Sequence, residues 1–135
     1  MRDDGLRGLS LLLVEDDYLL ASGLQEALEL EGATIVGPYP DVQGALRGIA
    51  QATTLDGALL DVNLGDETSF AVVEALRDRN VPMLFLTGYD DSALPAIYGD
   101  IPRCRKPVGL AELVRELNCH VARVGVTRIA PLQPG

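Results

Sequence analysis

Acidic and polar side chains stand at the ends of several short extended or apolar runs of this 135-residue chain. If those runs are strands of one parallel sheet, their carboxyl ends lie at the same edge, where ligands bind in such folds. The sequence therefore predicts one crevice that collects three carboxylates, a hydroxyl and an amine. The residues that terminate the runs are Glu15, Asp16, Asp61, Thr87 and Lys106.

The three acids predict a divalent cation. Carboxylates a few ångströms apart repel one another strongly and require a counter-charge. Mg²⁺ suits them because it is a hard cation that binds through one or two carboxylates together with a phosphate. A carboxylate beside such a cation can attack phosphorus and form an aspartyl phosphate, and Asp61 stands at the end of an apolar run. Phosphoryl transfer also needs positive charge and alignment, which Lys106 and the Thr87 hydroxyl would supply.

Each of these residues also has an ordinary structural explanation when it is taken alone. An aspartate after a strand is commonly a turn residue or a helix cap. Thr87 is a β-branched residue suited to a strand, and Lys106 resembles a solvated lysine before a turn. The combination favours the chemical interpretation. Pro107 follows the lysine, and we expect a cis bond there that aims the amine back into the crevice.

The elements that must position these groups follow from hydrophobic patterning. Apolar runs predict strands over Leu9–Val14, Ala33–Val36, Ala58–Val62 and Pro82–Thr87, and Gly37-Pro38 should end the second. A short and rather polar fifth strand is expected over Arg103–Arg105. Apolar residues at helical spacing predict helices over Tyr18–Glu31, from the cap Asp41 through Ala50, over Asp66–Arg79 and over Leu110–Val121, with a weaker one over Asp90–Tyr98. Asp66 and Glu67 should lie at the start of the third helix, where the dipole favours anions. The alternation predicts a parallel sheet with helices on both faces.

Length and composition indicate one globular domain, and we expect an extension over 1–8, a folded domain over 9–122 and a flexible tail over 123–135. The net charge of -9 argues against nucleic acid or an anionic membrane as the main partner. The chain shows neither a secretory signal nor the roughly 20-residue apolar run that would span a bilayer. Cys104 and Cys119 have no zinc or redox spacing. We therefore expect a cytoplasmic protein.

The ordered motifs resemble the receiver domain of bacterial response regulators over about Leu9 to Val121. They are Leu12-Leu13-Val14-Glu15-Asp16-Asp17, Leu59-Leu60-Asp61-Val62-Asn63-Leu64, Leu86-Thr87-Gly88 and Lys106-Pro107. The resemblance implies an α/β, flavodoxin-like (βα)5 three-layer sandwich with a five-stranded parallel sheet in the order 2-1-3-4-5. It implies Asp61 as phosphoacceptor, Thr87 and Lys106 as switch hydroxyl and lysine, and Glu15, Asp16, Asp61 and the Asn63 carbonyl as ligands of Mg²⁺.

Two features distinguish the chain within that resemblance. Family members usually carry Tyr or Phe three residues before the lysine, where Arg103 stands here. Tyr89 or Tyr98 could replace that ring, or both could simply be packing residues. The segment Phe85-Leu86-Thr87-Gly88-Tyr89 resembles a stand-alone Phe-x-Thr-Gly-Tyr subgroup associated with stress-type phosphorelays.

The resemblance implies a two-component phosphorelay module without an output domain, which signals to another protein. Because His120 is the only histidine, the phosphoryl donor should be a sensor histidine kinase or a histidine phosphotransfer protein. Such a chain is not an enzyme on a separate substrate, since it catalyses only its own phosphorylation and dephosphorylation. A phosphate sink and a degenerate receiver are alternatives. An aspartyl-phosphate phosphatase is disfavoured, because Asn63 stands where a general acid is needed. A flavodoxin-like nucleotide binder is disfavoured because no Gly-rich loop follows the first strand.

Overall fold

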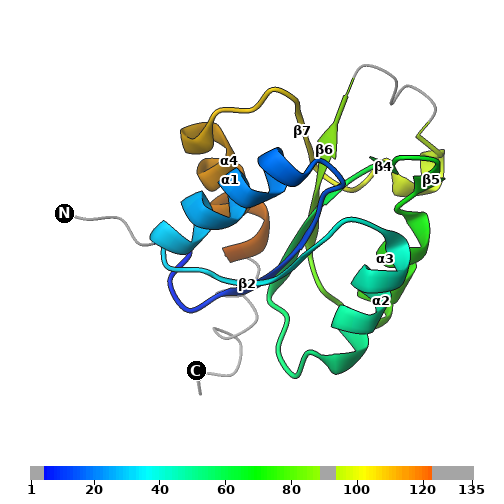
Figure 1. The fold of residues 1–135 in the computed structure, drawn as a ribbon, viewed down its shortest axis with the longest axis horizontal. Helices are drawn as coiled ribbons and strands as arrows, with labels where there is room; N and C mark the ends of the chain where they lie inside the picture. The colour runs from blue at the N-terminus through cyan, green and yellow to red at the C-terminus, as the bar shows by residue number, and fades with distance from the viewer. Residues whose placement is uncertain (1–4, 89–93, 123–135) are drawn as a thin grey trace, which may run out of the picture.

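A five-stranded parallel sheet forms the centre of the molecule, and the computed structural model describes residues 5–88 and 94–122 (Figure 1). The sheet order is β2-β1-β3-β6-β7, which is the predicted order 2-1-3-4-5 when its strands are counted along the chain. Its strands are β1 (Ser10–Val14), β2 (Thr34–Tyr39), β3 (Gly57–Asp61), β6 (Met83–Thr87) and β7 (Arg103–Arg105). The predicted flavodoxin-like fold is confirmed.

Helices cover both faces of this sheet. The helices α1 (Tyr18–Leu30) and α4 (Leu110–Leu117) lie on one face, and α2 (Val42–Gln51) and α3 (Phe70–Asp78) lie on the other. Among the described residues, no helix is both long and apolar enough to cross a bilayer.

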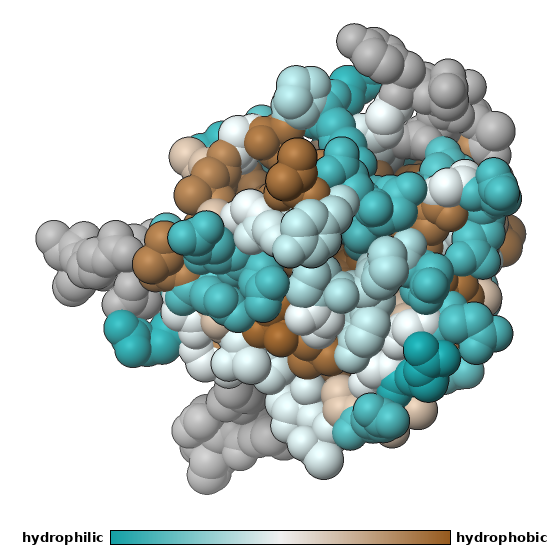
Figure 2. Space-filling model, in the orientation of Figure 1, coloured by the Kyte–Doolittle hydropathy of each residue, from teal (hydrophilic) through white to brown (hydrophobic). Residues whose placement is uncertain are grey.

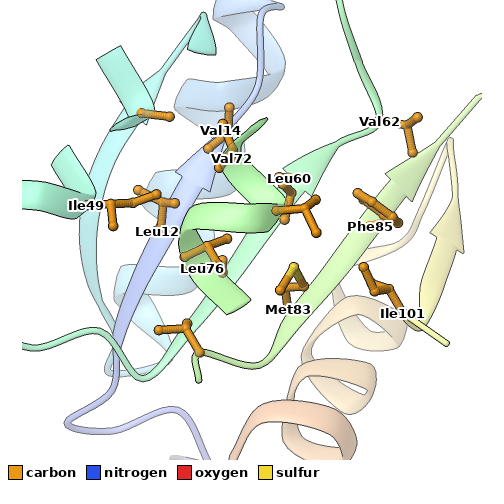
Figure 3. Close-up of a cluster of buried hydrophobic side chains, with 14 of the residues drawn as sticks. Leu12, Val14, Ile49, Leu60, Val62, Val72, Leu76, Met83, Phe85 and Ile101 are labelled. Atoms are coloured by element: carbon orange, nitrogen blue, oxygen red, sulfur yellow. The ribbon is translucent and has the colours of Figure 1, made fainter. Parts of the chain in front are cut away.

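The central strands are apolar throughout because both of their faces are buried. In β1, Leu12 and Val14 join the core under α2 and α3, whereas Leu11 and Leu13 join the core under α1 and α4. Figure 3 shows the first of these cores, with residues from three strands and from α2 and α3 packed together. Neighbouring strand ends are thereby held in a fixed register.

The predicted start of the third helix is wrong. Residues 63–68 form a short antiparallel hairpin of β4 (Asn63–Leu64) and β5 (Glu67–Thr68), and α3 begins only at Phe70. A two-residue ladder has too few positions to show a period, so residues 66–68 resemble the start of the helical pattern that follows. Asp66 and Glu67 therefore do not lie at the start of α3.

The predicted end of the second strand is also wrong. β2 continues through Gly37-Pro38 to Tyr39, and its pairing with β1 shifts register between Leu12 and Val14. Gly37 has a φ of 106°, and the Gly37-Pro38 peptide is cis. A proline is tolerated because β2 is an edge strand of the sheet.

The ends of the described chain differ from the expected boundaries in detail. Leu6, in the predicted extension, is fully buried in the core under α1 and α4, so residues 5–8 pack on the domain. The predicted last helix forms as α4 and then a π-helical turn, η3 (Asn118–Ala122). Of the weak helix predicted over Asp90–Tyr98, residues Ala96–Tyr98 form the 3₁₀ turn η2. Residues 89–93 lie outside the described residues. The predicted tail, 123–135, also lies outside them.

Candidate functional site

The acidic turn after β1 is held by backbone and side-chain hydrogen bonds. The Glu15 N–H donates to the carbonyl of Tyr39 at 3.0 Å, so the extension of β2 helps to fix this turn. The Asp17 N–H donates to Glu15 Oε2 at 2.9 Å. Asp17 also caps α1, because its Oδ1 accepts from the Leu20 N–H at 3.1 Å. Asp17 therefore has a structural role, and Glu15 and Asp16 remain free to meet Asp61.

Glu15, Asp16 and Asp61 form one cluster at the carboxyl end of the sheet, as predicted. One carboxylate oxygen from each lies within 4.8 Å of the other two. Glu15 and Asp61 are each only 2% exposed, whereas Asp16 is exposed. The cluster thus has a buried floor and a side that is open to solvent.

Lys106 reaches into this cluster from the end of β7. Its Nζ lies 3.0 and 3.1 Å from the two carboxylate oxygens of Asp61 and 3.1 Å from Glu15 Oε1. The Lys106-Pro107 peptide is cis, as predicted, and the Lys106 N–H donates to the Thr87 carbonyl at 2.7 Å. One ammonium group therefore contacts two buried acids at once.

The electrostatics of the site reflect an excess of buried negative charge. Burial raises the pKa of the Asp61 carboxyl to about 8, the hydrogen bond and repulsion from Glu15 raise it as well, and Lys106 opposes both. Burial lowers the pKa of the Lys106 amine, but its hydrogen bonds and attraction to Asp61 and Glu15 outweigh burial and raise it above 10.5. Without further positive charge, the site therefore favours a proton on Asp61 more than water does on an ordinary carboxyl group.

The donor set fits a hard divalent cation such as Mg²⁺. Among the described residues, Glu15 Oε1 and Asp61 Oδ1 accept no well-directed hydrogen bond, although the Lys106 ammonium is close to both. One oxygen from each of the three acids lies within 4.8 Å of the other two, near enough to share one small cation. An all-oxygen set with no histidine or thiolate favours Mg²⁺ over softer metals.

Thr87 and Asn63 lie at the same edge of the sheet as the acids. The Thr87 side chain is buried, and its hydroxyl donates to the Cys104 carbonyl on β7 at 3.3 Å. Asn63 is exposed and starts the hairpin after Asp61, opposite Thr68. The predicted roles of Thr87 as switch and of the Asn63 carbonyl as a ligand stay predictions.

Sequence patterns did not reveal the residues that support the site from neighbouring elements. The buried Ser69 donates from both its N–H and its hydroxyl to the Val62 carbonyl, next to Asp61. Glu67 contacts the start of α2. These contacts join segments distant in sequence, and no local spacing predicts them.

Known proteins share this sequence and architecture. Residues 11–118 match the response regulator receiver domain family. The TorCAD operon transcriptional regulatory protein TorR of Escherichia coli K12 is 32% identical over 125 residues, which cover 89% of this chain and 53% of TorR. The acid tolerance regulatory protein ActR of Sinorhizobium medicae is 35% identical over 62% of this chain and 43% of its own length. The chain thus spans about half the length of the curated relatives it matches.

Two solved structures show the same fold at appreciable identity. The solution structure of SdrG from Sphingomonas melonis Fr1 is 37% identical with a TM-score of 0.71, over 81% of this chain and 92% of that one. The crystal structure of the TorR receiver domain is 32% identical with a TM-score of 0.68, over 81% of this chain and 92% of that one. The family match covers most of the chain and includes the acidic cluster and Lys106. This chain belongs to the response regulator receiver domain family of two-component systems.

Proposed function

We propose that this chain accepts a phosphoryl group from a phosphohistidine of another protein onto Asp61 and signals by protein–protein interaction. The observation that carries the proposal is the pairing of one lysine with two buried acids, next to a third acid that is open to solvent. A buried carboxylate with this much surrounding negative charge is useful only where a cation and an incoming anion complete the charge balance.

The transfer forms a phosphorus–oxygen bond at Asp61 and breaks the phosphorus–nitrogen bond of the donor, whose imidazole leaves and takes up a proton. Bound Mg²⁺ would supply positive charge to the phosphoryl oxygens, held by Glu15, Asp16, Asp61 and the Asn63 carbonyl. The Lys106 ammonium already faces both Asp61 oxygens and can move its contact to a phosphoryl oxygen. Thr87 would turn its hydroxyl from Cys104 to that phosphoryl group.

The donor must come from outside the chain. The single histidine, His120, pairs with Glu116 at 3.2 Å and lines a small cavity with Pro82 and Met83 at the beginning of β6. Asp61 stands at the opposite, carboxyl end of the sheet. We therefore assign the donor as a sensor histidine kinase or a histidine phosphotransfer protein, and the recipient of the signal as a further protein.

An apolar groove beside Lys106 supports a protein donor. The groove has a volume of about 380 Å³ between α1 and the connection from β7 to α4. Hydrophobic side chains gather over α1 and the start of α4 (Figure 2), and Leu19 on α1 is 80% exposed. A donor that reaches Asp61 passes this surface, which offers it apolar contact area. The groove is lined by Leu20, Leu24, Leu86, Gly88, Lys106, Pro107 and Val108.

Phosphorylation by a small donor tests the acceptor directly. The protein is mixed with Mg²⁺ and acetyl phosphate or phosphoramidate, and the acid-labile label is located by mass spectrometry. The label should lie on Asp61, disappear in Asp61→Asn, and persist in the control Asp66→Asn, whose carboxylate lies outside the cluster. Equal labelling of Asp61→Asn would overturn the assignment.

Phosphorylation by a protein donor tests the docking surface. A phosphorylated histidine kinase that labels the wild-type chain should label Leu19→Ser more slowly. It should label Leu30→Ser, which changes an equally exposed leucine at the far end of α1, at the wild-type rate. Both variants should react normally with acetyl phosphate. Equal rates for the two variants with the protein donor would argue against this surface.

We further propose that the chain acts in the cytoplasm and turns over no separate substrate. Asn63, two residues after Asp61, offers no general acid for a phosphatase. Generic phosphate esters should therefore not be hydrolysed, and turnover that depends on Asp61 would favour the phosphatase instead. Rapid loss of the label without any effect on a second protein would favour a phosphate sink, and failure to label would favour a degenerate receiver.

A further inference from the structure

The hairpin β4–β5 follows the proposed phosphoacceptor directly and is too small to hold its own shape. It contains two residue pairs, Asn63 with Thr68 and Leu64 with Glu67. Its other residues are exposed, and Leu64 alone is buried. An isolated ladder of this size is not stable in water, so the rest of the molecule must fix it.

Three contacts of different kinds hold the hairpin. The Leu64 side chain lies in the core under α2 and α3. Ser69 closes the base of the hairpin through its two hydrogen bonds to the Val62 carbonyl. Glu67 reaches sideways, because its Oε2 accepts from the Val42 N–H at 3.2 Å. The first two contacts fix the base and the inner face, and Glu67 fixes the outer strand.

The Glu67 contact is favourable because of where it meets α2. Val42 is the first residue of α2, and the first turn of that helix contains no acid of its own. The cap Asp41 accepts only the Gly44 N–H through its side chain. A carboxylate from the hairpin therefore satisfies a second free N–H at the positive end of the helix dipole.

The fixed hairpin forms one wall of the acidic cluster. Its turn passes through Gly65, which has a φ of 66°. A Cβ at Gly65 would lie 4.0 Å from Asp16 Oδ2, so the turn backbone closely approaches the most exposed acid of the cluster. Movement of the hairpin would alter both this wall and the backbone that leaves Asp61.

We propose that Glu67 is a positioning residue, which ties the hairpin to α2 and so holds the cation-binding side of the Asp61 site in place. The proposal rests on the proposed function, because it assigns Glu67 to the Mg²⁺ step that precedes phosphoryl transfer. Glu67 acts through the hairpin backbone and does not touch the reacting groups.

The test compares three full-length variants. Glu67→Ala removes both the charge and the acceptor, Glu67→Gln removes only the charge, and Asp66→Asn removes a charge from the same hairpin. Mg²⁺ binding is measured by calorimetry, and amide hydrogen exchange is measured across residues 62–69. Glu67→Ala should accelerate hairpin exchange and weaken Mg²⁺ binding by about two- to fivefold. Glu67→Gln should change both less, and Asp66→Asn should leave exchange as in the wild type.

Unchanged hairpin exchange in Glu67→Ala would overturn the proposal, whatever happens to Mg²⁺ binding. Faster exchange with wild-type Mg²⁺ affinity would overturn it as well, because Glu67 would then be structural only. Neither measurement needs phosphorylation. If the wild-type chain binds Mg²⁺ but takes no label at Asp61, the proposed function fails while the role of Glu67 is still decided.

Discussion

Two neighbouring parts of the carboxyl edge of the sheet are held together by different kinds of interaction. At the ends of β1 and β3, Glu15 and Asp61 are buried charges whose nearest cation is Lys106. At the ends of β6 and β7, Thr87 and Cys104 are joined by a neutral hydrogen bond, and Arg103 is exposed. The first part keeps charges in fixed positions at a cost in stability, whereas the second is held by ordinary packing and pairing.

The difference separates the part of the edge with the proposed chemistry from the part with the proposed signalling role. The aromatic residue that family members usually carry on the last strand is replaced by Arg103, which extends into solvent. One buried ring near this region is Tyr98, which faces α3, since its centroid lies 4.8 Å from that of Phe70. A change at Thr87 therefore has no ring on β7 to move.

The largest expected effect comes from removing the cation of the charged half. Lys106→Met keeps most of the aliphatic stem but leaves Glu15 and Asp61 without a counter-charge. At pH 8 without Mg²⁺, the free energy of unfolding should fall by about 2–3 kcal/mol, as measured with urea. Arg105→Met, an exposed neighbour, should change it by less than about 0.5 kcal/mol. Mg²⁺ should restore part of the lost stability, and equal behaviour of the two variants would contradict the description of the charged half.

Removing a buried acid by Asp61→Asn should stabilise the metal-free protein, by an amount that depends on pH. Asp61 has a pKa of about 8 when folded and an ordinary value of 3.8 when unfolded. Between these values the folded state binds the extra proton, so its stability falls as pH rises, by at most about 1.4 kcal/mol per pH unit. In Asp61→Asn the side chain at this position does not titrate, so this loss of stability with rising pH is absent.

The stability advantage of Asp61→Asn over the wild type should therefore grow between pH 5 and pH 8 without Mg²⁺, by on the order of 1–2 kcal/mol. Asp41→Asn, which changes a helix cap away from the cluster, should be no more stable than the wild type at either pH. A constant difference between Asp61→Asn and the wild type from pH 5 to pH 8 would show that Asp61 is ionised throughout.

The sequence predicted the charged half better than the other half, for a physical reason. A strand buried on both faces must be apolar, so an acid at its end stands out, and parallel topology then brings such ends together. This logic located Glu15, Asp16, Asp61 and Lys106, whereas the order of the strands was implied by the resemblance to receiver domains. It requires only the identity of each strand end and the handedness of the connections.

The remaining features depend on contacts that local patterns do not encode. The hairpin 63–68 is too short to show a period, and the extension of β2 passes through a Gly-Pro pair that usually ends a strand. The direction of the Thr87 hydroxyl and the partner of Glu67 are set by neighbours far away in the sequence. Such contacts become visible only after the elements have been packed.

The smallest expected effect tests whether the packing of η2 against α3 is independent of phosphorylation at Asp61. Tyr98 is 5% exposed, its hydroxyl donates to Glu74 on α3 at 2.7 Å, and the Arg77 guanidinium lies 5.4 Å from its ring centroid. The hydrogen bond to Glu74, together with burial and the charge of Glu74, raises the pKa of the Tyr98 phenol above 10. Tyr98→Phe removes only the hydroxyl.

We expect Tyr98→Phe to lower the free energy of unfolding by about 1 kcal/mol, while Tyr18→Phe, an exposed tyrosine, changes it very little. The last tyrosine to ionise in an alkaline absorbance titration of the folded wild type should be missing in Tyr98→Phe. Labelling of Asp61 by acetyl phosphate should proceed at the wild-type rate in both variants, because the described contacts of Tyr98 are to Phe70, Glu74 and Arg77 and not to the acidic cluster. A slower rate in Tyr98→Phe alone would mean that α3 already transmits the state of η2 to Asp61, and the two halves of the edge would then form one coupled unit.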